Sequence, residues 1–156
     1  MDEIDRNLLV ALQQDGAAGL ADLAKVAGLS VSATAERVKR LEERGTIRGW
    51  RADLEPSAVG CPLLAWVFVS LRSGPKDDAA FRRAAQKHEA ILECHAVTGP
   101  WTFLLKLRLP DLAGLERFVT EEIRGQPGVV NTEVTIAMSS AKETAILPVA
   151  EAEEEE

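Results

Sequence analysis

The sequence predicts an α+β protein built from two parts, a bundle of three short helices and a ferredoxin-like βαββαβ domain. Three segments in the first third carry apolar residues at helical spacing and are separated by turns that contain glycine. From residue 63 onward, strand-like runs alternate with helical patterns in the order β-α-β-β-α-β. Between the two parts, residues 46–60 look like a connector that is punctuated by Pro56 and Gly60.

Three helices are predicted in the first part. Asp2 can cap the first helix, which ends in the run 13–16, and Gly28 can end the second because glycine accepts a left-handed conformation. Ser30 can cap the third helix, which we expect over Val31–Arg44. The inward-facing stripes of the three helices are Ile4, Leu8, Ala11 and Leu12; Leu20, Leu23, Ala24 and Ala27; and Thr34, Val38 and Leu41.

The second part is predicted to contain four strands and two helices. We expect the strands over residues 63–72, 91–98, 101–109 and 129–138, and the helices over 77–88 and 110–123. Residues 139–149 can add a short edge strand before an acidic tail at 150–156. The expected organisation is therefore a helical domain over 1–48, a linker strand or hinge over 49–62, the βαββαβ domain over 63–149, and the tail.

Composition and charge indicate an ordinary globular protein that works outside membranes. Apolar residues make up 46% of the chain and charged residues 28%. No apolar run approaches the roughly 20 residues that a membrane helix needs. The N-terminus is acidic where a signal peptide would be basic and then apolar. We expect a cytoplasmic protein with no membrane partner.

The cysteine pattern favours neither a disulfide nor a metal site. Cys61 and Cys94 are the two cysteines, and we expect both to be reduced and to pack as small apolar side chains. His95 follows Cys94 directly, but neighbours on a strand point to opposite faces and make a poor pair of ligands. Isolated Cys and His residues lack the spacing of metal ligands, so we predict no metal and no cofactor.

The second and third helices match the helix-turn-helix pattern. In this motif a small core holds the second of the two helices so that its outer face can enter the major groove of double-stranded DNA. Between Val31 and Arg51 six cations stand against three anions, which leaves +3 locally although the net charge of the chain is −7. We predict base contacts from Ser32, Ala33 and Glu36, and phosphate contacts from Arg37, Lys39, Arg40 and Arg44.

Two other interpretations of these charges stay open. The charged residues can simply solvate the outer face of a surface helix. Arg37 can instead form a salt bridge inside the helical part. The glycine-containing turn and the apolar spacing on both sides of it favour the DNA-binding interpretation.

Several motifs occur in order and at fixed intervals along the chain. They are Ile-Asp-Arg-Asn-Leu-Leu at 4–9, Asp-Leu-Ala at 22–24, Gly-Leu-Ser at 28–30, Arg-Val-Lys-Arg-Leu-Glu-Glu-Arg-Gly-Thr-Ile at 37–47, Gly-Trp-Arg-Ala-Asp-Leu-Glu-Pro at 49–56, Val-Thr-Gly at 97–99 and a Thr-X-Ile run ending in Lys142. Together they resemble the Lrp/AsnC family, also called feast/famine regulators, from Asp2 to Pro148. The resemblance implies a transcriptional regulator with a winged helix-turn-helix whose third helix binds DNA.

The resemblance also implies how such a regulator assembles and responds. The C-terminal domain of the family dimerises and often assembles dimers into octamers, and amino acids or related metabolites bind between these domains. We expect a dimer at least, because a lone helix-turn-helix buries too little surface for tight specific binding. The apolar area for the interface is predicted to come from Trp66, Phe68, Trp101 and Phe103.

One segment departs from the family pattern. The effector loop of the family typically reads Gly-Asp-X-Asp, whereas this chain has Gly99-Pro100-Trp101-Thr102 and lacks both acids. A buried ammonium without a carboxylate partner is costly, so we predict that the effector is not a standard amino acid. An aromatic compound or a keto acid fits better, or regulation occurs without an effector.

The candidate effector site is placed between subunits. Its predicted residues are Gly99, Pro100, Trp101 and Thr102, with Thr132 and Thr135 as polar contacts. Two alternatives remain: Trp101 packs only in an interface between subunits, or Glu133 of a partner subunit replaces the missing acid.

Two other classes of function compete with that of a DNA-binding regulator. Haem-pathway decarboxylases resemble the same architecture, but they carry a His-Asn-Tyr-X-X-Arg cluster where this chain has Glu-Cys-His-Ala-Val-Thr at 93–98. The acid–base and anion-binding groups are missing and the chain contains no tyrosine, so we predict that it is not an enzyme. A metabolite sensor that does not bind DNA is the third possibility, and the net negative charge favours it slightly.

Overall fold

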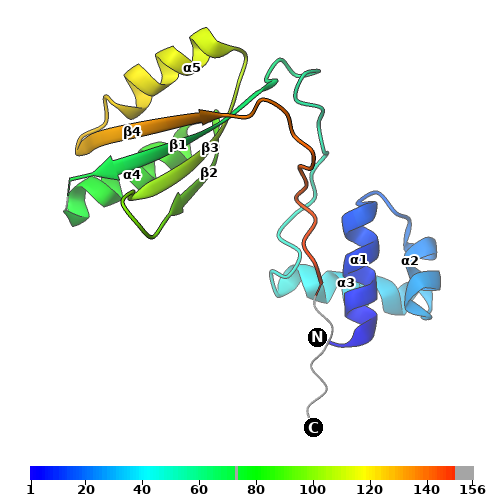
Figure 1. Ribbon diagram of the computed structural model, residues 1–156. Helices are drawn as coiled ribbons and strands as arrows, with labels where there is room; N and C mark the ends of the chain where they lie inside the picture. The colour runs from blue at the N-terminus through cyan, green and yellow to red at the C-terminus, as the bar shows by residue number, and fades with distance from the viewer. Residues whose placement is uncertain (73, 150–156) are drawn as a thin grey trace. The chain divides into compact units, whose positions relative to one another are not determined.

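The computed structural model describes residues 1–72 and 74–149, and its internal contacts divide the chain into two units. The first unit comprises Met1–Asp53 together with the segment that starts at Lys142, and the second is Leu54–Ala141. Figure 1 shows the helical first unit and, in the second, a sheet on which helices pack. The predicted acidic tail at 150–156 lies outside the described residues.

The first unit is a three-helix bundle, as the sequence predicts. Its helices are α1 (Glu3–Gln14), α2 (Leu20–Ala27) and α3 (Val31–Glu43). The Asp2 carboxylate caps α1 by accepting the Asp5 N–H at 2.8 Å, and Gly28 ends α2 in the left-handed conformation with φ 64°. The apolar stripes meet in one small core of Leu8, Leu12, Leu23 and Ala27, against which Val38 and Ile47 pack.

The chain between α3 and residue 63 differs from the prediction. Residues 49–55 have no regular secondary structure and residues 56–60 form turns, so the linker strand and the wing are not formed. A lone extended segment has no neighbouring strand to pair its backbone N–H and C=O groups. Trp50 packs on the bundle, since its ring lies against Gly16 and its Nε1 donates to Glu42 at 2.8 Å, and Leu54 is 61% exposed.

The C-terminal segment also forms no edge strand. Residues 139–149 lack strand structure, and in the first unit Leu147 is bound by a side chain instead. The Gln13 amide accepts the Leu147 N–H at 2.7 Å and donates to the Leu147 carbonyl at 3.0 Å. One amide side chain thus satisfies both polar groups of a backbone residue that has no ladder partner.

The second unit has the predicted βαββαβ order. Its elements are β1 (Leu63–Leu71), α4 (Pro75–Lys87), β2 (Ile91–Ala96), β3 (Phe103–Leu109), α5 (Leu112–Phe118), η1 (Val119–Ile123) and β4 (Val129–Ile136). The sheet is antiparallel with the strand order β2-β3-β1-β4, which is the ferredoxin-like arrangement. One difference is that the last helix does not stay α-helical, because η1 continues α5 as a π-helical turn.

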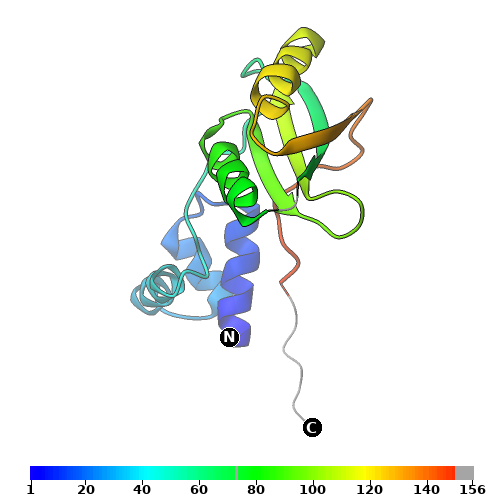
Figure 2. The same cartoon turned by 90° about the vertical axis from the view of Figure 1, so that its left-hand side faces the viewer.

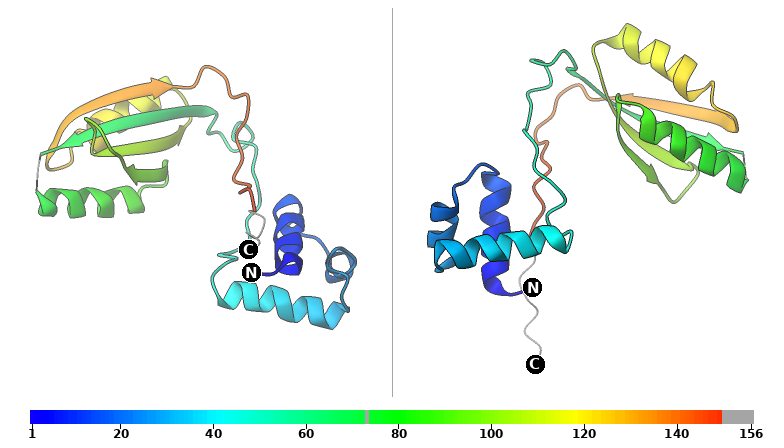
Figure 3. Two further views of the ribbon diagram at one scale, coloured as in Figure 1. Left: turned by 60° about the horizontal axis from the view of Figure 1, so that its bottom comes forward. Right: turned by 180° about the vertical axis from the view of Figure 1, so that it is seen from behind.

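Helices α4 and α5 lie on the same side of the sheet, as Figures 2 and 3 show from several directions. The buried residues of β1 and β3 face these helices, and Phe81 of α4 stacks on Phe103 with ring centroids 5.1 Å apart. Phe103 is fully buried there, so the prediction that it contributes to a subunit interface is wrong. Trp66 and Phe68 alternate with the core residues of β1 and therefore belong to the face without helices.

None of the described helices has the length and apolar character that crossing a bilayer requires.

Candidate functional site

The N-terminus of α3 is held by a compact set of hydrogen bonds. The Ser30 hydroxyl accepts the Ala33 N–H at 3.2 Å and lies 3.2 Å from the Ser32 hydroxyl. Thr34, which is fully buried, donates its hydroxyl to the Ser30 carbonyl at 3.0 Å. This capping places the first turn of α3 in one orientation, with Ser32 and Glu36 exposed and Ala33 half-buried.

Arg37 joins α3 to α1. Its guanidinium donates through Nη1 to Asp2 at 2.6 Å and to Asp5 at 2.8 Å, and its side chain is only 22% exposed. The pKa of Asp2 is held below its usual value, first by the Asp5 N–H and then by Arg37. The structure thus gives Arg37 the salt-bridge role that the sequence left open beside the phosphate contact.

The other three predicted phosphate contacts lie on the solvent side of α3. Lys39 is exposed and pairs weakly with Glu43 at 3.7 Å, one helical turn later. Arg40 is exposed on α3, Arg44 is exposed at its C-cap, and neither has an ion-pair partner among the described residues. The outer face of α3 therefore presents cations that are available for a polyanion.

The predicted effector loop is tied to the end of β1. The Thr102 N–H donates to the Val69 carbonyl at 2.8 Å, and its hydroxyl accepts the Leu71 N–H at 3.0 Å. The Ser70 hydroxyl donates to the Pro100 carbonyl at 3.2 Å. Gly99 has φ 101°, a conformation that few other residues adopt. The loop is thus an ordered turn, and part of the hydrogen-bonding capacity of Thr102 is already used.

Thr132 and Thr135 do not lie together. Thr132 is opposite Val69 and Thr135 is opposite Trp66, so their side chains belong to opposite faces of the sheet. Thr132 also accepts a hydrogen bond from Arg124 Nε at 2.9 Å. The structure brings Thr132 and Thr102 to either side of Val69, whereas Thr135 is farther along β4 and on the face without helices.

Glu133, which the sequence suggested only as a residue of a partner subunit, lies near the loop within the same chain. Glu133 is opposite Phe68 in the sheet, on the face without helices, and the Trp101 ring packs on Phe68 with centroids 5.8 Å apart. Odd and even positions of β4 point to opposite faces of the sheet. This alternation in the sequence places Glu133 and Thr135 on one face and Thr132 on the other.

The Cys94–His95 pair shows no catalytic or metal-binding arrangement. His95 lies 3.1 Å from Glu93 on the surface, and burial raises the pKa of the Cys94 thiol, which keeps it protonated and weakly nucleophilic. Within the described part of the chain, no group of three or more His, Cys, Asp or Glu residues is placed to hold a metal ion.

Both units of this chain match known proteins. The family model for the AsnC-type helix-turn-helix domain matches residues 1–42, and that for the Lrp/AsnC ligand binding domain matches residues 64–147. The leucine-responsive regulatory proteins of Escherichia coli (strain K12) and of Salmonella typhimurium are each 39% identical over 145 residues, which covers 92% of this chain and 88% of theirs.

Solved structures show a similarity to the same family. A transcriptional regulator from Neisseria meningitidis, solved as a complex with L-Met, has a TM-score of 0.91 at 29% identity and covers 95% of this chain and 96% of its own. An AsnC family transcriptional regulator from Agrobacterium tumefaciens has a TM-score of 0.90 at 30% identity, with coverages of 95% and 97%. With its helix-turn-helix unit and its ferredoxin-like ligand-binding unit, this chain belongs to the Lrp/AsnC family of transcriptional regulators.

Proposed function

We propose that α3 enters the major groove of double-stranded DNA and reads a specific sequence. Ser32, Ala33 and Glu36 in its first two turns face base edges, where Glu36 can accept from a cytosine amino group and Ala33 can touch a thymine methyl. Lys39, Arg40 and Arg44 serve phosphates, while Arg37 mainly holds α3 against α1. The observation that carries this proposal is that Arg40 and Arg44 are exposed and have no ion-pair partner in the described chain.

The test is the salt dependence of DNA binding by the full-length protein. An operator is first obtained from genome-wide mapping of bound DNA or from a gel shift with the upstream region of its own gene. Arg40→Ala should weaken binding to all sequences and reduce the slope of log K against log salt by about 1 per subunit bound. Arg83→Ala, on the exposed side of α4, is the matched control and should leave the slope unchanged. An unchanged slope for Arg40→Ala would refute the phosphate contact.

Assembly is the second part of the proposal. The protein acts as a dimer at least, and as an octamer when dimers associate, so that paired α3 helices read two half-sites about one helical turn apart. It performs no catalysis, because its relatives are regulators and Cys94 and His95 lack an activating arrangement.

We propose that the loop at 99–102 holds the effector and that Thr132 is its polar neighbour. Thr135 points to the other face of the sheet. Without the two loop acids, an ammonium group loses a charge-assisted bond worth about 1.5–3 kcal/mol, or roughly tenfold to a hundredfold or more in affinity. We therefore favour an aromatic compound or a keto acid. The competing candidate is a standard amino acid, because a relative was solved with L-Met and Glu133 is available near the loop.

Calorimetric titration with the twenty amino acids and matching keto acids separates these candidates. We expect simple aliphatic amino acids to bind weakly or not at all at the loop. Trp101→Ala identifies binding at this site, because a loop ligand should lose affinity in that variant and a ligand bound elsewhere should not. Micromolar binding of an aliphatic amino acid that disappears in Trp101→Ala would contradict the proposal.

A further inference from the structure

A hollow of about 190 Å³ lies between α4 and the helical segment formed by α5 and η1, on the side of the sheet away from Trp66 and Phe68. Its apolar lining includes Phe81 and Phe118, which are both buried, together with Ile91 and Ile123. The His88 ring meets Phe118 edge-on with centroids 4.4 Å apart and forms one wall. An apolar cavity of about 150 Å³ is large enough to take up benzene, so this hollow has room for an aromatic ring.

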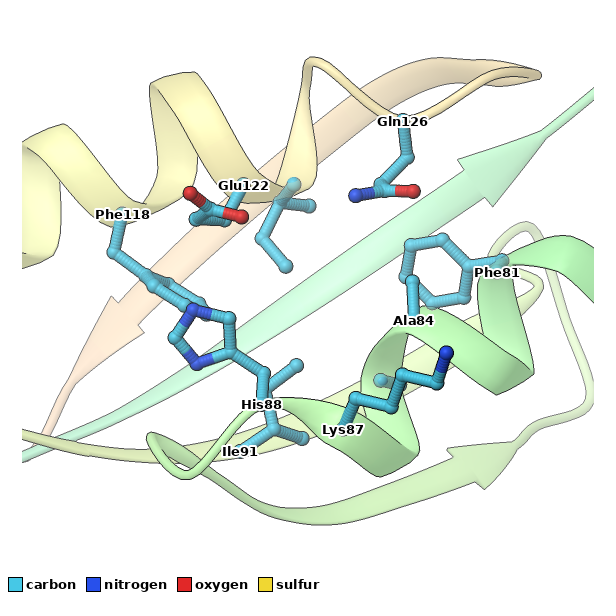
Figure 4. Close-up of a pocket in the computed structure, with 10 residues that line it drawn as sticks. Phe81, Ala84, Lys87, His88, Ile91, Phe118, Glu122 and Gln126 are labelled. Carbon is cyan, nitrogen blue, oxygen red and sulfur yellow. The ribbon is translucent and has the colours of Figure 1, made fainter.

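Polar side chains approach the hollow from both helical segments, as Figure 4 shows. Lys87 comes from the end of α4, Glu122 from η1, and Gln126 from the turn that follows. The side chains of all three make no hydrogen bond or ion pair with any described residue. A cation and an anion thus border one apolar hollow without neutralising each other, which leaves both free for a ligand.

His88 adds a donor of defined orientation. Its Nδ1 accepts the Ala90 N–H at 3.4 Å, so Nε2 is the ring nitrogen that is left to donate. A carboxylate bound by Lys87 can also accept from the Gln126 amide, whereas the His88 N–H is a donor at the Phe118 end of the hollow. Glu122 supplies an acceptor for a donor group on the same ligand.

The backbone at this place is unusual in a way that shapes the hollow. Arg124 N–H donates to the Val119 carbonyl at 2.9 Å, a bond between residues five apart that defines the π-turn. Such turns are rare and occur often at functional sites. Gly125 follows it, and a Cβ there would collide with the Glu121 carbonyl oxygen, so a side chain at this position would disrupt the turn. The glycine at position 125 thus permits the π-turn, and the π-turn brings Glu122 and Ile123 to the hollow.

We propose that this hollow is a second small-molecule site, which takes an aromatic carboxylic acid that bears a hydrogen-bond donor, amino or hydroxyl, beside its carboxylate. The ring occupies the apolar lining, Lys87 binds the carboxylate, and Glu122 accepts from the donor group. The site is separate from the loop at 99–102, because none of the residues that line the hollow belongs to that loop. Its failure would leave the DNA-binding proposal unchanged.

The experiment is a titration of the full-length protein, with labelled Ala, Ile and Val methyl groups, followed by NMR. The ligands are L-phenylalanine, phenyllactate and phenylpyruvate, which share a ring and a carboxylate and carry an amino group, a hydroxyl group and no donor, respectively. We expect saturable shifts of the Ala84, Ile91 and Ile123 methyl groups with the first two ligands. Phenylpyruvate should bind at least tenfold more weakly.

Substitutions at the rim and in the lining make the result specific. Lys87→Met should weaken binding of both ligands about tenfold to a hundredfold, and Glu122→Gln should weaken L-phenylalanine more than phenyllactate. Ala84→Leu should fill the hollow and abolish binding. Lys76→Met and Glu116→Gln change the same residue types on exposed parts of α4 and α5 outside the hollow and should have no effect.

Three outcomes would overturn the proposal. The first is the absence of saturable shifts at the three methyl groups with every ligand. The second is equal binding by the Lys87→Met variant and by the unchanged protein. Both should fold, because Lys87 is exposed. The third is a response confined to Val97 beside the 99–102 loop, which would assign the same ligands to the loop instead.

Discussion

At the scale of single residues, charge in the first unit serves two different purposes. Arg37 is mostly covered and bridges two carboxylates of α1, whereas Arg40, one turn later on α3, is exposed and without an ion-pair partner in the described chain. Exposed ion pairs contribute little to stability, but a half-buried cation that bridges two acids fixes the orientation of α3 against α1. Specific DNA contacts need that orientation to be constant.

The titration of Asp2 tests this division of roles. The pKa of Asp2 lies below its usual value because it accepts the Asp5 N–H and, as a smaller effect, because Arg37 is bound to it. We expect Arg37→Leu to raise this pKa only part of the way to the usual value, as measured from the carbon-13 shift of the Asp2 carboxyl group. A full return would show that Arg37, and not the N-cap bond, is the main cause.

The same shift has a consequence for acid stability. Since the folded pKa of Asp2 is lower than the unfolded one, its contribution is complete above about pH 4 and is lost as pH falls through the folded pKa. In Asp2→Asn the helical unit should therefore lose less stability between pH 4 and pH 2 than in the unchanged protein. Urea unfolding followed by the fluorescence of Trp50, in a Trp66→Phe/Trp101→Phe background, measures the difference.

At the scale of elements, helices α3 and α5 are each fixed at the N-terminal end by a side-chain cap. Helix α3 begins at a serine cap that also aligns Ser32, and α5 begins at Asp111, whose carboxylate accepts the Gly114 N–H at 2.7 Å. Helix α5 then changes to a π-turn where it borders the hollow. The capped end of α3 faces the bases in the proposed complex, so order in its first turn matters for recognition.

Removing one cap should therefore affect one unit only. We expect Ser30→Ala to cost about 0.5–2 kcal/mol, to speed hydrogen exchange of the Ala33 amide, and to weaken specific DNA binding more than non-specific binding. Asp111→Ala removes the equivalent bond in the second unit and should speed exchange at Gly114 alone. Equal loss of DNA binding in both variants would argue against a local role of the α3 cap.

At the scale of the whole molecule, each unit has a surface that no described element of the same unit covers. In the first unit this is the cationic outer face of α3, and in the second it is the sheet face that carries Trp66 and Phe68. Aromatic residues on a sheet face without helices favour contact with another subunit. In the function that we propose, the regulator contacts DNA through the first of these surfaces and assembles through the second.

Phe68→Asp is expected to shift the assembly towards monomers, because it replaces the ring that packs on Trp101 by a carboxylate opposite Glu133. Sedimentation velocity at micromolar concentration measures the result. Leu112→Asp makes the same kind of change at a 62% exposed position of α5 and should leave the assembly intact. A monomeric unchanged protein, or a Phe68→Asp variant that assembles normally, would contradict this role of the sheet face.

The sequence by itself determined the order of the elements, the helix caps and the cationic face of α3. These features depend on residues that are close together in the chain, such as Ser30 with Ala33 or the apolar spacing from Leu20 to Ala27, so local patterns contain the necessary information. The sequence also indicates that Thr132 and Thr135 lie on opposite faces of the sheet, because positions three apart on a strand point to opposite faces.

Only the tertiary structure decided the features that depend on distant segments. It buried Phe103 against Phe81, joined Arg37 to Asp2 and Asp5, and left the segment after α3 without a strand partner. It also opened the hollow between α4 and η1, whose residues come from two helices and a turn. Which side chains meet across such distances is set by sheet register and helix packing, and neither follows from the order of residues along one segment.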